Sequence, residues 1–220
     1  EIAGTAKKNG IPLMIDDYHG TNVVPLSFTE EELEHVYLLI GGYKYLQWGE
    51  ANCFLRYPAD CELRPAITGW FSAFQQLDHP RTDEPVSFDD NDQKFATATY
   101  DPISQYRAAA VTGFFQKQGL SPDLLQKQYR AQVRYLRELF DEKNYKGSKI
   151  DHANTRPIEE TGGFMALRSP NARKIRADLL EKGVFTDARN DIIRFGPAPY
   201  TTAEQCEAVI DELFATIRSY

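Results

Sequence analysis

The sequence predicts an α/β protein in which part of a large, mostly parallel sheet precedes a small α/β domain. Short apolar runs that end in polar or glycine residues alternate with longer amphipathic segments, as strands and helices do. The 220 residues, 42% hydrophobic and 26% charged, have the composition of a globular protein. A formal net charge of −7 without a basic stripe argues against nucleic acid or an anionic membrane as a partner.

The first hundred residues contain the predicted strands of the larger sheet. Residues 1–8 have the pattern of a helix end, and Thr29 with the three glutamates after it predicts a helix start. Apolar runs predict buried strands at 11–15 and 35–40, and a third strand is expected at 51–57, after the turn at Gly49. Residues 58–95 are expected to be irregular. Because the chain opens inside a helix–strand unit and without Met, we expect a segment to precede it.

The remaining residues predict a complete second domain. A helical pattern covers residues 102–118, and Ser121-Pro122-Asp123 predicts the start of a long amphipathic helix that ends near Tyr145. Further strands are expected at 163–167, near Val184 and at 192–195, and further helices at 171–182 and 202–219. We therefore expect part of a large domain over residues 1–101 and a small C-terminal α/β domain over residues 102–220.

The cysteines and the apolar runs indicate where the protein works. Cys53, Cys61 and Cys206 form no metal-binding pair, and so few cysteines predict a reducing, cytoplasmic compartment. The longest apolar run, residues 36–40, is far too short to span a bilayer.

Lys44, Asp16 and His19 are the first candidates for chemistry. Lys44 follows a predicted buried strand, where loss of hydration favours the neutral amine that attacks carbonyls; the alternative is a lysine that extends into solvent. Asp16 and His19 follow the strand at 11–15, and ligands of open α/β sheets bind beyond such strand ends. Alternatively, Asp16 is a turn residue, His19 a hydrogen-bonded loop residue, or Asp16, Asp17 and His19 a metal site.

An aspartate and a lysine also form the pair that pyridoxal phosphate requires. The lysine holds the aldehyde, and the carboxylate keeps the pyridine nitrogen protonated. Around these residues, Asp16-Asp-Tyr-His19 followed by Val24-Pro-Leu26 resembles a segment of the kynureninases, class V enzymes of pyridoxal phosphate fold type I. Tyr43-Lys44-Tyr45-Leu46 is similar to the Tyr-Lys-Tyr-Leu of that family, whose lysine carries the cofactor.

Three later segments extend the resemblance over nearly the whole chain. Gly69-Trp70 and Phe95-Ala-Thr-Ala-Thr99 resemble parts of the family's cofactor pocket, although Ala98 stands where the family has glycine. Residues 187–199, which include Arg189 and Arg194, resemble the segment that binds the α-carboxylate of the substrate. The resemblance thus implies a fold-type-I, aminotransferase-like fold.

The resemblance also implies a role for each residue. Lys44 would be the catalytic, cofactor-bearing lysine, and His19 would lie near the phenolic oxygen of the ring. Asp16 would pair with the ring nitrogen, with Asp17 as its competitor. Hydrogen bonds to the phosphate are implied for three residues: Tyr43, Trp70 and Thr99.

The alternatives are that Tyr43 is a packed core tyrosine, Trp70 a buried tryptophan and Thr99 a helix-capping threonine.

On its strand, Arg194 alternates in facing with its neighbours, and its guanidinium can form a two-pronged pair with a carboxylate. Arg189 is the second choice, and a surface ion pair is the alternative for Arg194.

The implied activity is hydrolytic Cβ–Cγ cleavage of an amino acid by a homodimer with a shared active site. Residues 50–54 and 78–92 depart from the family pattern, so the substrate stays open. Aminotransfer, cysteine desulfurase or C–S lyase chemistry, and a non-catalytic protein of this fold are the alternatives. A desulfurase needs a mobile cysteine, and only Cys61 is expected to be exposed enough.

The glycine-rich phosphate loop and the ring-stacking aromatic residue of such enzymes are not found in these 220 residues. We expect them in the preceding segment. Residues 1–220 alone are therefore expected to bind pyridoxal phosphate weakly or not at all.

Overall fold

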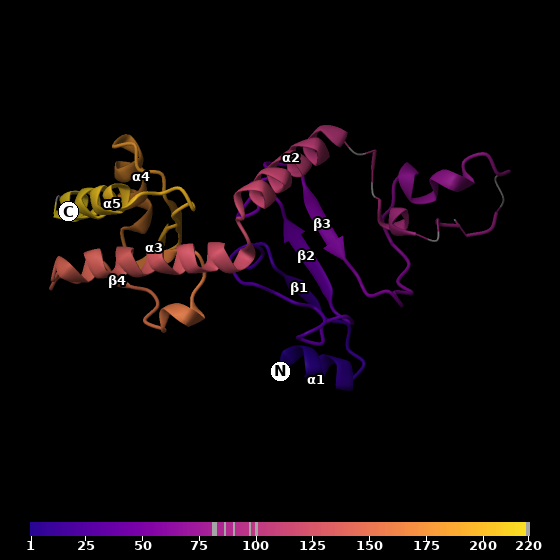
Figure 1. The fold of residues 1–220 in the computed structure, drawn as a ribbon, viewed down its shortest axis with the longest axis horizontal. Coiled ribbons are helices and arrows are strands. Elements are labelled where there is room, and N and C mark those ends of the chain that lie inside the picture. Colours follow the sequence, from indigo (N-terminus) through magenta and orange to yellow (C-terminus); the bar gives the residue numbers. More distant parts are fainter. Residues whose placement is uncertain (81–82, 86, 90, 97, 100, 219–220) are drawn as a thin grey trace. The chain divides into compact units, whose positions relative to one another are not determined.

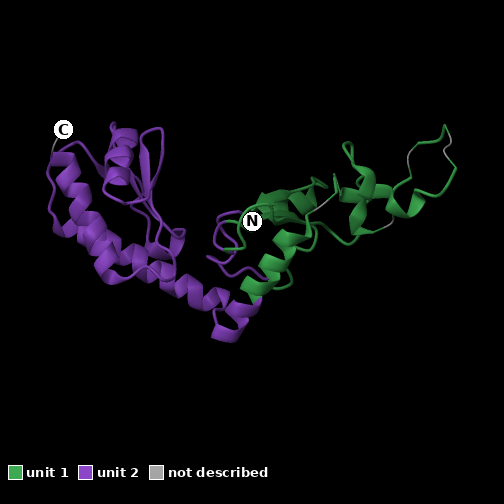
Figure 2. Cartoon of the chain, turned by 90° about the horizontal axis from the view of Figure 1, so that it is seen from above, with its two compact units in different colours: residues 1–16, 28–43, 47–112 green, residues 17–27, 44–46, 113–220 purple. Residues whose placement is uncertain are grey.

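A computed structural model describes residues 1–80, 83–85, 87–89, 91–96, 98–99 and 101–218, which form two compact units (Figures 1 and 2). Unit 1 comprises residues 1–16, 28–43 and 47–112, and unit 2 comprises residues 17–27, 44–46 and 113–220. The units interleave in sequence, because two loops of the first fifty residues group with the C-terminal half. The division into a large-domain part and a small domain at residue 101 stays a prediction.

Unit 1 contains a three-stranded sheet of order β1-β2-β3. Strand β1 (Met14–Asp16) pairs in parallel with β2 (Tyr37–Gly41), and β2 pairs antiparallel with β3 (Cys53–Arg56). Because β1 and β2 are parallel, their carboxyl ends lie at the same edge of the sheet. The chain continues from these two ends into the segments that carry His19 and Lys44.

The helices of unit 1 lie at its two ends in the sequence. Helix α1 (Ile2–Lys8) begins the chain, helix α2 (Pro102–Gln118) starts in unit 1 and continues past its last residue, 112, and two 3-10 helices lie between them, η1 (Trp70–Gln76) and η2 (Asp92–Phe95). The side chain of Arg107 on α2 donates to the carbonyls of Trp48 and Glu50, at 2.5 Å each. Gly49 between them has φ +74°, and a Cβ there would lie 2.6 Å from the Arg107 guanidinium carbon. The turn before β3 therefore needs glycine.

Two expectations for unit 1 are corrected. The helix predicted from Thr29 does not form: residues 29–32 are turns, and Glu32 has φ +55°, which interrupts helical geometry. The strand predicted as buried at 11–15 is shortened to β1, and Met14 is 57% exposed. The buried side chains of unit 1 include Leu38 of β2, which is 3% exposed, and Val36 just before it, which is 0% exposed.

Unit 2 contains a four-stranded antiparallel sheet of order β4-β5-β7-β6. Its strands are β4 (Asp151–His152), β5 (Met165–Arg168), β6 (Asp187–Arg189) and β7 (Ile192–Phe195). Its helices are α3 (Pro122–Glu142), α4 (Ala172–Glu181), α5 (Ala203–Arg218) and the 3-10 helix η3 (Ile158–Glu160). Helix α5 packs against both α3 and α4.

One continuous core holds unit 2 together. Four of its side chains, each 0% exposed, come from α4, β7 and α5: Ile175, Leu179, Ile193 and Leu213. The periodicity of α3 explains its share of this core, to which it contributes Val133, Leu136 and Phe140. Leu125 and Tyr129 of the same helix are buried in a second, smaller cluster. The predicted N-cap is confirmed, because the Ser121 side chain accepts a hydrogen bond from the Leu124 amide at 3.2 Å.

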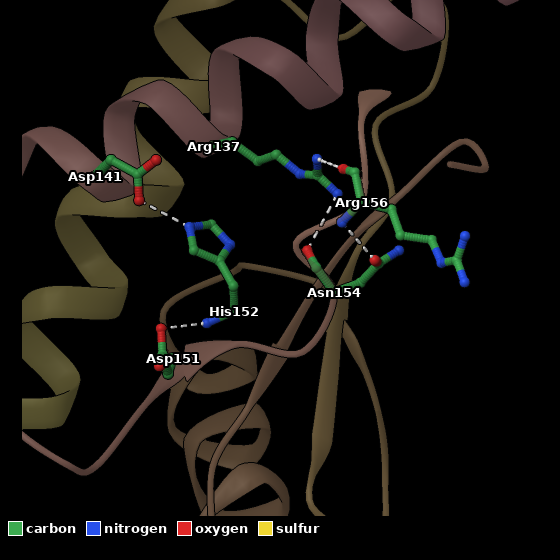
Figure 3. A network of polar contacts seen from close by, with 6 residues as sticks. All are labelled: Arg137, Asp141, Asp151, His152, Asn154 and Arg156. Carbon is green, nitrogen blue, oxygen red and sulfur yellow. Dashed lines mark hydrogen bonds and ion pairs between the residues drawn. The ribbon is translucent and has the colours of Figure 1, made fainter. Parts of the chain in front are cut away.

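Polar contacts attach β4 and the loop after it to α3 (Figure 3). His152 Nε2 lies 2.8 Å from Asp141 Oδ1, and the Arg137 guanidinium donates to the carbonyls of Asn154 and Arg156. The two bonds from Arg137 satisfy carbonyl oxygens of the loop that follows β4.

The remaining differences in unit 2 concern element ends. Helix α3 ends at Glu142, before Tyr145, and β5 begins at Met165 where a start at 163 was predicted. The strand predicted near Val184 is wrong: the Val184 amide donates to the Leu179 carbonyl as part of the turn after α4, and the strand follows at β6. The predicted end of the last helix, residue 219, lies outside the described residues.

Candidate active site

Lys44 and His19 meet in two loops of unit 2. The Lys44 Nζ atom lies 2.7 Å from His19 Nε2. At this distance one nitrogen must offer a lone pair to the other, so the pair does not carry two full positive charges. Either a Lys44 ammonium donates to an unprotonated His19 Nε2, or a neutral Lys44 amine accepts from a protonated one. In both arrangements Lys44 can exchange a proton with His19.

The loop that carries His19 is closed by its own side chains. The Thr21 hydroxyl donates to Asp17 Oδ2, and the Gly20 and Thr21 amides donate to the Asp17 carbonyl. A Cβ on Gly20 would lie 1.9 Å from Asp17 Oδ1, so a larger residue there would displace the Asp17 side chain. Since the Asp17 carboxylate serves the turn, Asp16 is the better candidate for a ring nitrogen, as the sequence also suggested.

Asn22 ties this loop to the lysine. Its side-chain amide donates to the Tyr45 carbonyl at 3.2 Å, across 23 residues of sequence. Asn22 has φ +68°, a conformation that asparagine tolerates better than most residues. The sequence analysis missed this residue, although an asparagine in the segment Gly20-Thr21-Asn22 is a recognisable turn signal.

Two aromatic rings border the pair. The His19 ring centre lies 6.5 Å from that of Tyr45 and 6.3 Å from that of Phe164, in edge-to-face geometry. Tyr45 packs in turn on Tyr129, which is 2% exposed, at 5.3 Å between ring centres. Burial raises the pKa of the Tyr45 phenol, and the positive charge of Arg194 partly offsets the rise. The phenol therefore stays protonated at neutral pH.

Arg194 lies on β7 with the predicted alternation. Its neighbours Ile193 and Phe195 are 0% and 3% exposed, whereas the Arg194 side chain is 24% exposed. Its guanidinium forms an ion pair with Asp187, and its guanidinium carbon lies 5.4 Å from the ring centre of Phe164.

Arg189, the second choice, is more exposed. It lies on the edge strand β6, its side chain is 75% exposed, and its Nε atom is 3.5 Å from the same Asp187 carboxylate. Such an exposed pair is a surface ion pair. Arg194, half enclosed and close to Phe164, is therefore the stronger candidate for binding a carboxylate.

The remaining predicted site residues belong to unit 1. Asp16 ends β1, and Tyr43 follows β2 with 43% of its surface exposed. Trp70 begins η1 and is 62% exposed, so it is not the buried tryptophan of the alternative interpretation.

Thr99 is exposed and lies outside helices and strands. It does not cap α2, since the Ile103 amide donates to Asp101 Oδ1 instead. Thr97 of the same motif lies outside the described residues.

The cysteines are placed differently from what the sequence suggested. Cys53 on β3 is the exposed one, whereas Cys61 is half-buried and its Sγ atom accepts a hydrogen bond from the Tyr37 hydroxyl at 3.3 Å. Cys206 is 2% exposed, in agreement with its predicted packing role. Among the described residues, no group of three His, Cys, Asp or Glu side chains could hold a metal ion, and no helix is long and apolar enough to cross a membrane.

Each unit by itself carries donors that suit pyridoxal phosphate. In unit 2, a lysine beside an imidazole suits an aldehyde next to a phenolic oxygen. In unit 1, the carboxylate that ends β1 suits a pyridine nitrogen. Arg194 adds a fork-shaped donor for an amino-acid carboxylate. Tyr43, Trp70 and Thr99, which were predicted to bond to the phosphate, are each exposed in unit 1.

Comparisons with known proteins agree with this assignment. Residues 125–213 match the family model of the kynureninase C-terminal domain. The chain is 27% identical over 218 residues to an uncharacterized aminotransferase of Bacillus subtilis, YcbU, covering 97% of this chain and 54% of that protein. It therefore spans about half the length of the curated relative that it matches.

Solved structures share the fold. A cysteine desulfurase from Thermococcus onnurineus superposes with a TM-score of 0.78 at 13% identity, covering 100% of this chain and 56% of that one. The cystine C-S lyase C-DES, in complex with cysteine persulfide, gives a TM-score of 0.70 at 20% identity, covering 88% of this chain and 49% of that one. These structures share the fold of the chain, and residues 125–213 are similar to the C-terminal domain of the kynureninases.

Proposed function

We propose that the chain supplies the lysine and the substrate-binding arginine of an enzyme that acts on an amino acid, and that the reaction is kynureninase-like hydrolytic Cβ–Cγ cleavage. The contact between Lys44 Nζ and His19 Nε2 is the observation that carries the proposal. The match to the kynureninase C-terminal domain favours this reaction over others of the same class.

Each side chain then has a defined task. Lys44 would hold the aldehyde of the cofactor, and its amine would move the proton at the substrate α-carbon. His19 accepts or donates the proton at Lys44 Nζ, and Asp16 pairs with the ring nitrogen. When bound, the cofactor supplies an electron sink for loss of the α-proton.

Substrate and phosphate are held by other residues. Arg194 binds the α-carboxylate, with Arg189 as the second choice, and Tyr43, Trp70 and Thr99 bond to the phosphate. In the hydrolysis, water adds to a side-chain carbonyl and the Cβ–Cγ bond breaks, which releases alanine and a carboxylic acid. We place the enzyme in the cytoplasm as a homodimer with a shared active site.

Replacing Lys44 tests this assignment. In the intact protein reconstituted with pyridoxal phosphate, the visible absorbance of the lysine-bound cofactor should be abolished by borohydride reduction and be absent from Lys44→Ala, because the bond to the protein is made by that amine. Lys127→Ala, which removes an exposed lysine of α3, is the matched control and should keep the absorbance. Persistence of the band in Lys44→Ala would show that another group carries the cofactor.

Aminotransfer is the second candidate, favoured by the similarity to YcbU over 97% of the chain. Product analysis separates the reactions: alanine with a carboxylic acid for hydrolysis, a keto acid for aminotransfer, and sulfide for C–S lyase or desulfurase chemistry. Desulfurase chemistry is the least supported, because it needs a mobile cysteine. Cys206 is buried, Cys61 accepts a hydrogen bond from Tyr37, and the exposed Cys53 is held in strand β3.

A further inference from the structure

Phe164 contacts two ionisable groups of the candidate site from one position. Its ring centre lies 6.3 Å from that of His19, with 67° between the planes, and 5.4 Å from the guanidinium carbon of Arg194. All three residues belong to unit 2. Phe164 is half-buried and directly precedes β5, which pairs with the strand of Arg194.

Arg194 is held from two sides by different interactions. Asp187, its register partner across the β6–β7 hairpin, forms an ion pair with the guanidinium. Phe164 lies within the distance at which an aromatic ring attracts a cation. An arginine whose plane is held in advance loses less conformational freedom when a carboxylate binds.

We propose that Phe164 is a positioning residue for the substrate carboxylate, since its ring orients the Arg194 guanidinium while its contact with His19 keeps the imidazole beside Lys44. The inference rests on the proposed function, because it assigns Arg194 to an amino-acid carboxylate. It also defines the ligand class: α-amino acids with a free carboxylate are selected over the corresponding amines.

Substitutions at Phe164 separate this role from simple packing. Leucine keeps an apolar side chain but has no ring quadrupole to attract the guanidinium, whereas tyrosine keeps the ring. Phe185, 85% exposed and in the same unit, provides a matched control, because Phe185→Leu makes the same chemical change away from Arg194.

The experiment compares L-alanine with ethylamine, which differ by the carboxylate alone. Calorimetry on the intact protein loaded with pyridoxal phosphate should show that Phe164→Leu weakens L-alanine binding by about 3- to 30-fold, the range of a cation–π contact, and leaves ethylamine binding unchanged. Phe164→Tyr should restore L-alanine affinity, and Phe185→Leu should not alter it.

A double-mutant cycle tests whether Phe164 acts through Arg194. In an Arg194→Lys background, Phe164→Leu should have no further effect on L-alanine binding, because the fork that the ring orients is gone. Additive effects, equal losses for L-alanine and ethylamine, or no rescue by tyrosine would each overturn the inference.

A different measurement would contradict the proposed function, namely the absence of the lysine-bound cofactor's absorbance from the wild-type protein. In that case the role of Phe164 would still be decided by the L-alanine affinities, since calorimetry measures them with or without the cofactor.

Discussion

The chemistry of single residues here is decided by the atoms within a few ångströms of them. Lys44 is one of many lysines in the chain, and its contact with His19 Nε2 at 2.7 Å distinguishes it. Asp17 accepts a hydrogen bond from the Thr21 hydroxyl and so serves the turn, which leaves Asp16 as the better candidate for the ring nitrogen. A side chain engaged in closing a turn has fewer lone pairs to offer a ligand.

Cys206 allows a test at this scale. Burial raises the pKa of its thiol above the ordinary value, and the Glu207 carboxylate adds to the rise, so little thiolate exists at pH 8. Iodoacetamide should therefore label the exposed Cys53 in the native protein and leave Cys206 unmodified, as peptide mass spectrometry would show. In urea all three cysteines should react.

The raised pKa of Cys206 also determines how the stability of the protein changes with pH. A thiol with a raised pKa contributes stability that is complete below its unfolded pKa and is lost as the pH rises through its folded pKa. Labelling of native Cys206 as fast as Cys53 would contradict its burial and would make it a candidate for sulfur transfer.

At the scale of elements, the backbone just before β5 lies close to the side chain of Tyr45. Gly163 is buried, and a Cβ on it would lie 2.9 Å from Cε1 of Tyr45. Tyr45 cannot easily yield, because its ring packs on buried Tyr129. The start of β5 thus sets the position of the tyrosine next to Lys44, and with it the loop that carries the lysine.

Gly163→Ala should therefore displace Tyr45 and destabilise the protein by about 1–3 kcal/mol, the usual cost of overpacking. Urea unfolding measures the change in free energy. Gly162→Ala is the matched control, since a Cβ on the neighbouring glycine meets nothing within 4 Å. Equal stabilities of the two variants would show that Tyr45 moves aside at no cost.

At the scale of the molecule, the main core is confined to one stretch of chain. All its buried members lie between Val133 and Ile217, in α3, α4, α5, the strands of unit 2 and their connections. A second, smaller cluster joins Val23 and Tyr45 of the two early loops to Leu125 and Tyr129 of α3. The loops that carry His19 and Lys44 are therefore attached to α3 by a cluster separate from the main core.

We expect residues 113–218 expressed alone to fold and to unfold cooperatively, because they contain the whole main core. Circular dichroism during heating tests this. Leu213→Ala, at a fully buried position, should lower stability by about 2–5 kcal/mol, whereas Leu124→Ala, 47% exposed on α3, should change it little. A gradual transition without a midpoint, or equal effects of the two substitutions, would show that the core needs the early loops.

Features that depend on neighbours in sequence were predictable. Helix α2 has the predicted bounds, Pro102–Gln118, and α3 begins at the predicted cap. The alternation around Arg194 also follows from strand periodicity. By contrast, the helix predicted at Thr29 was wrong, because the positive φ of Glu32 is part of a turn that local propensity did not indicate.

Fold class and the identity of the candidate lysine, histidine and arginine could be inferred from motifs and periodicity alone, since these are properties of short segments. Folding was needed to show that Lys44 meets His19, 25 residues away, and that Phe164 lies against both His19 and Arg194. The physical reason is that contacts between distant segments depend on how whole elements pack, and no local preference of Phe164 or Asn22 encodes which side chain it will meet.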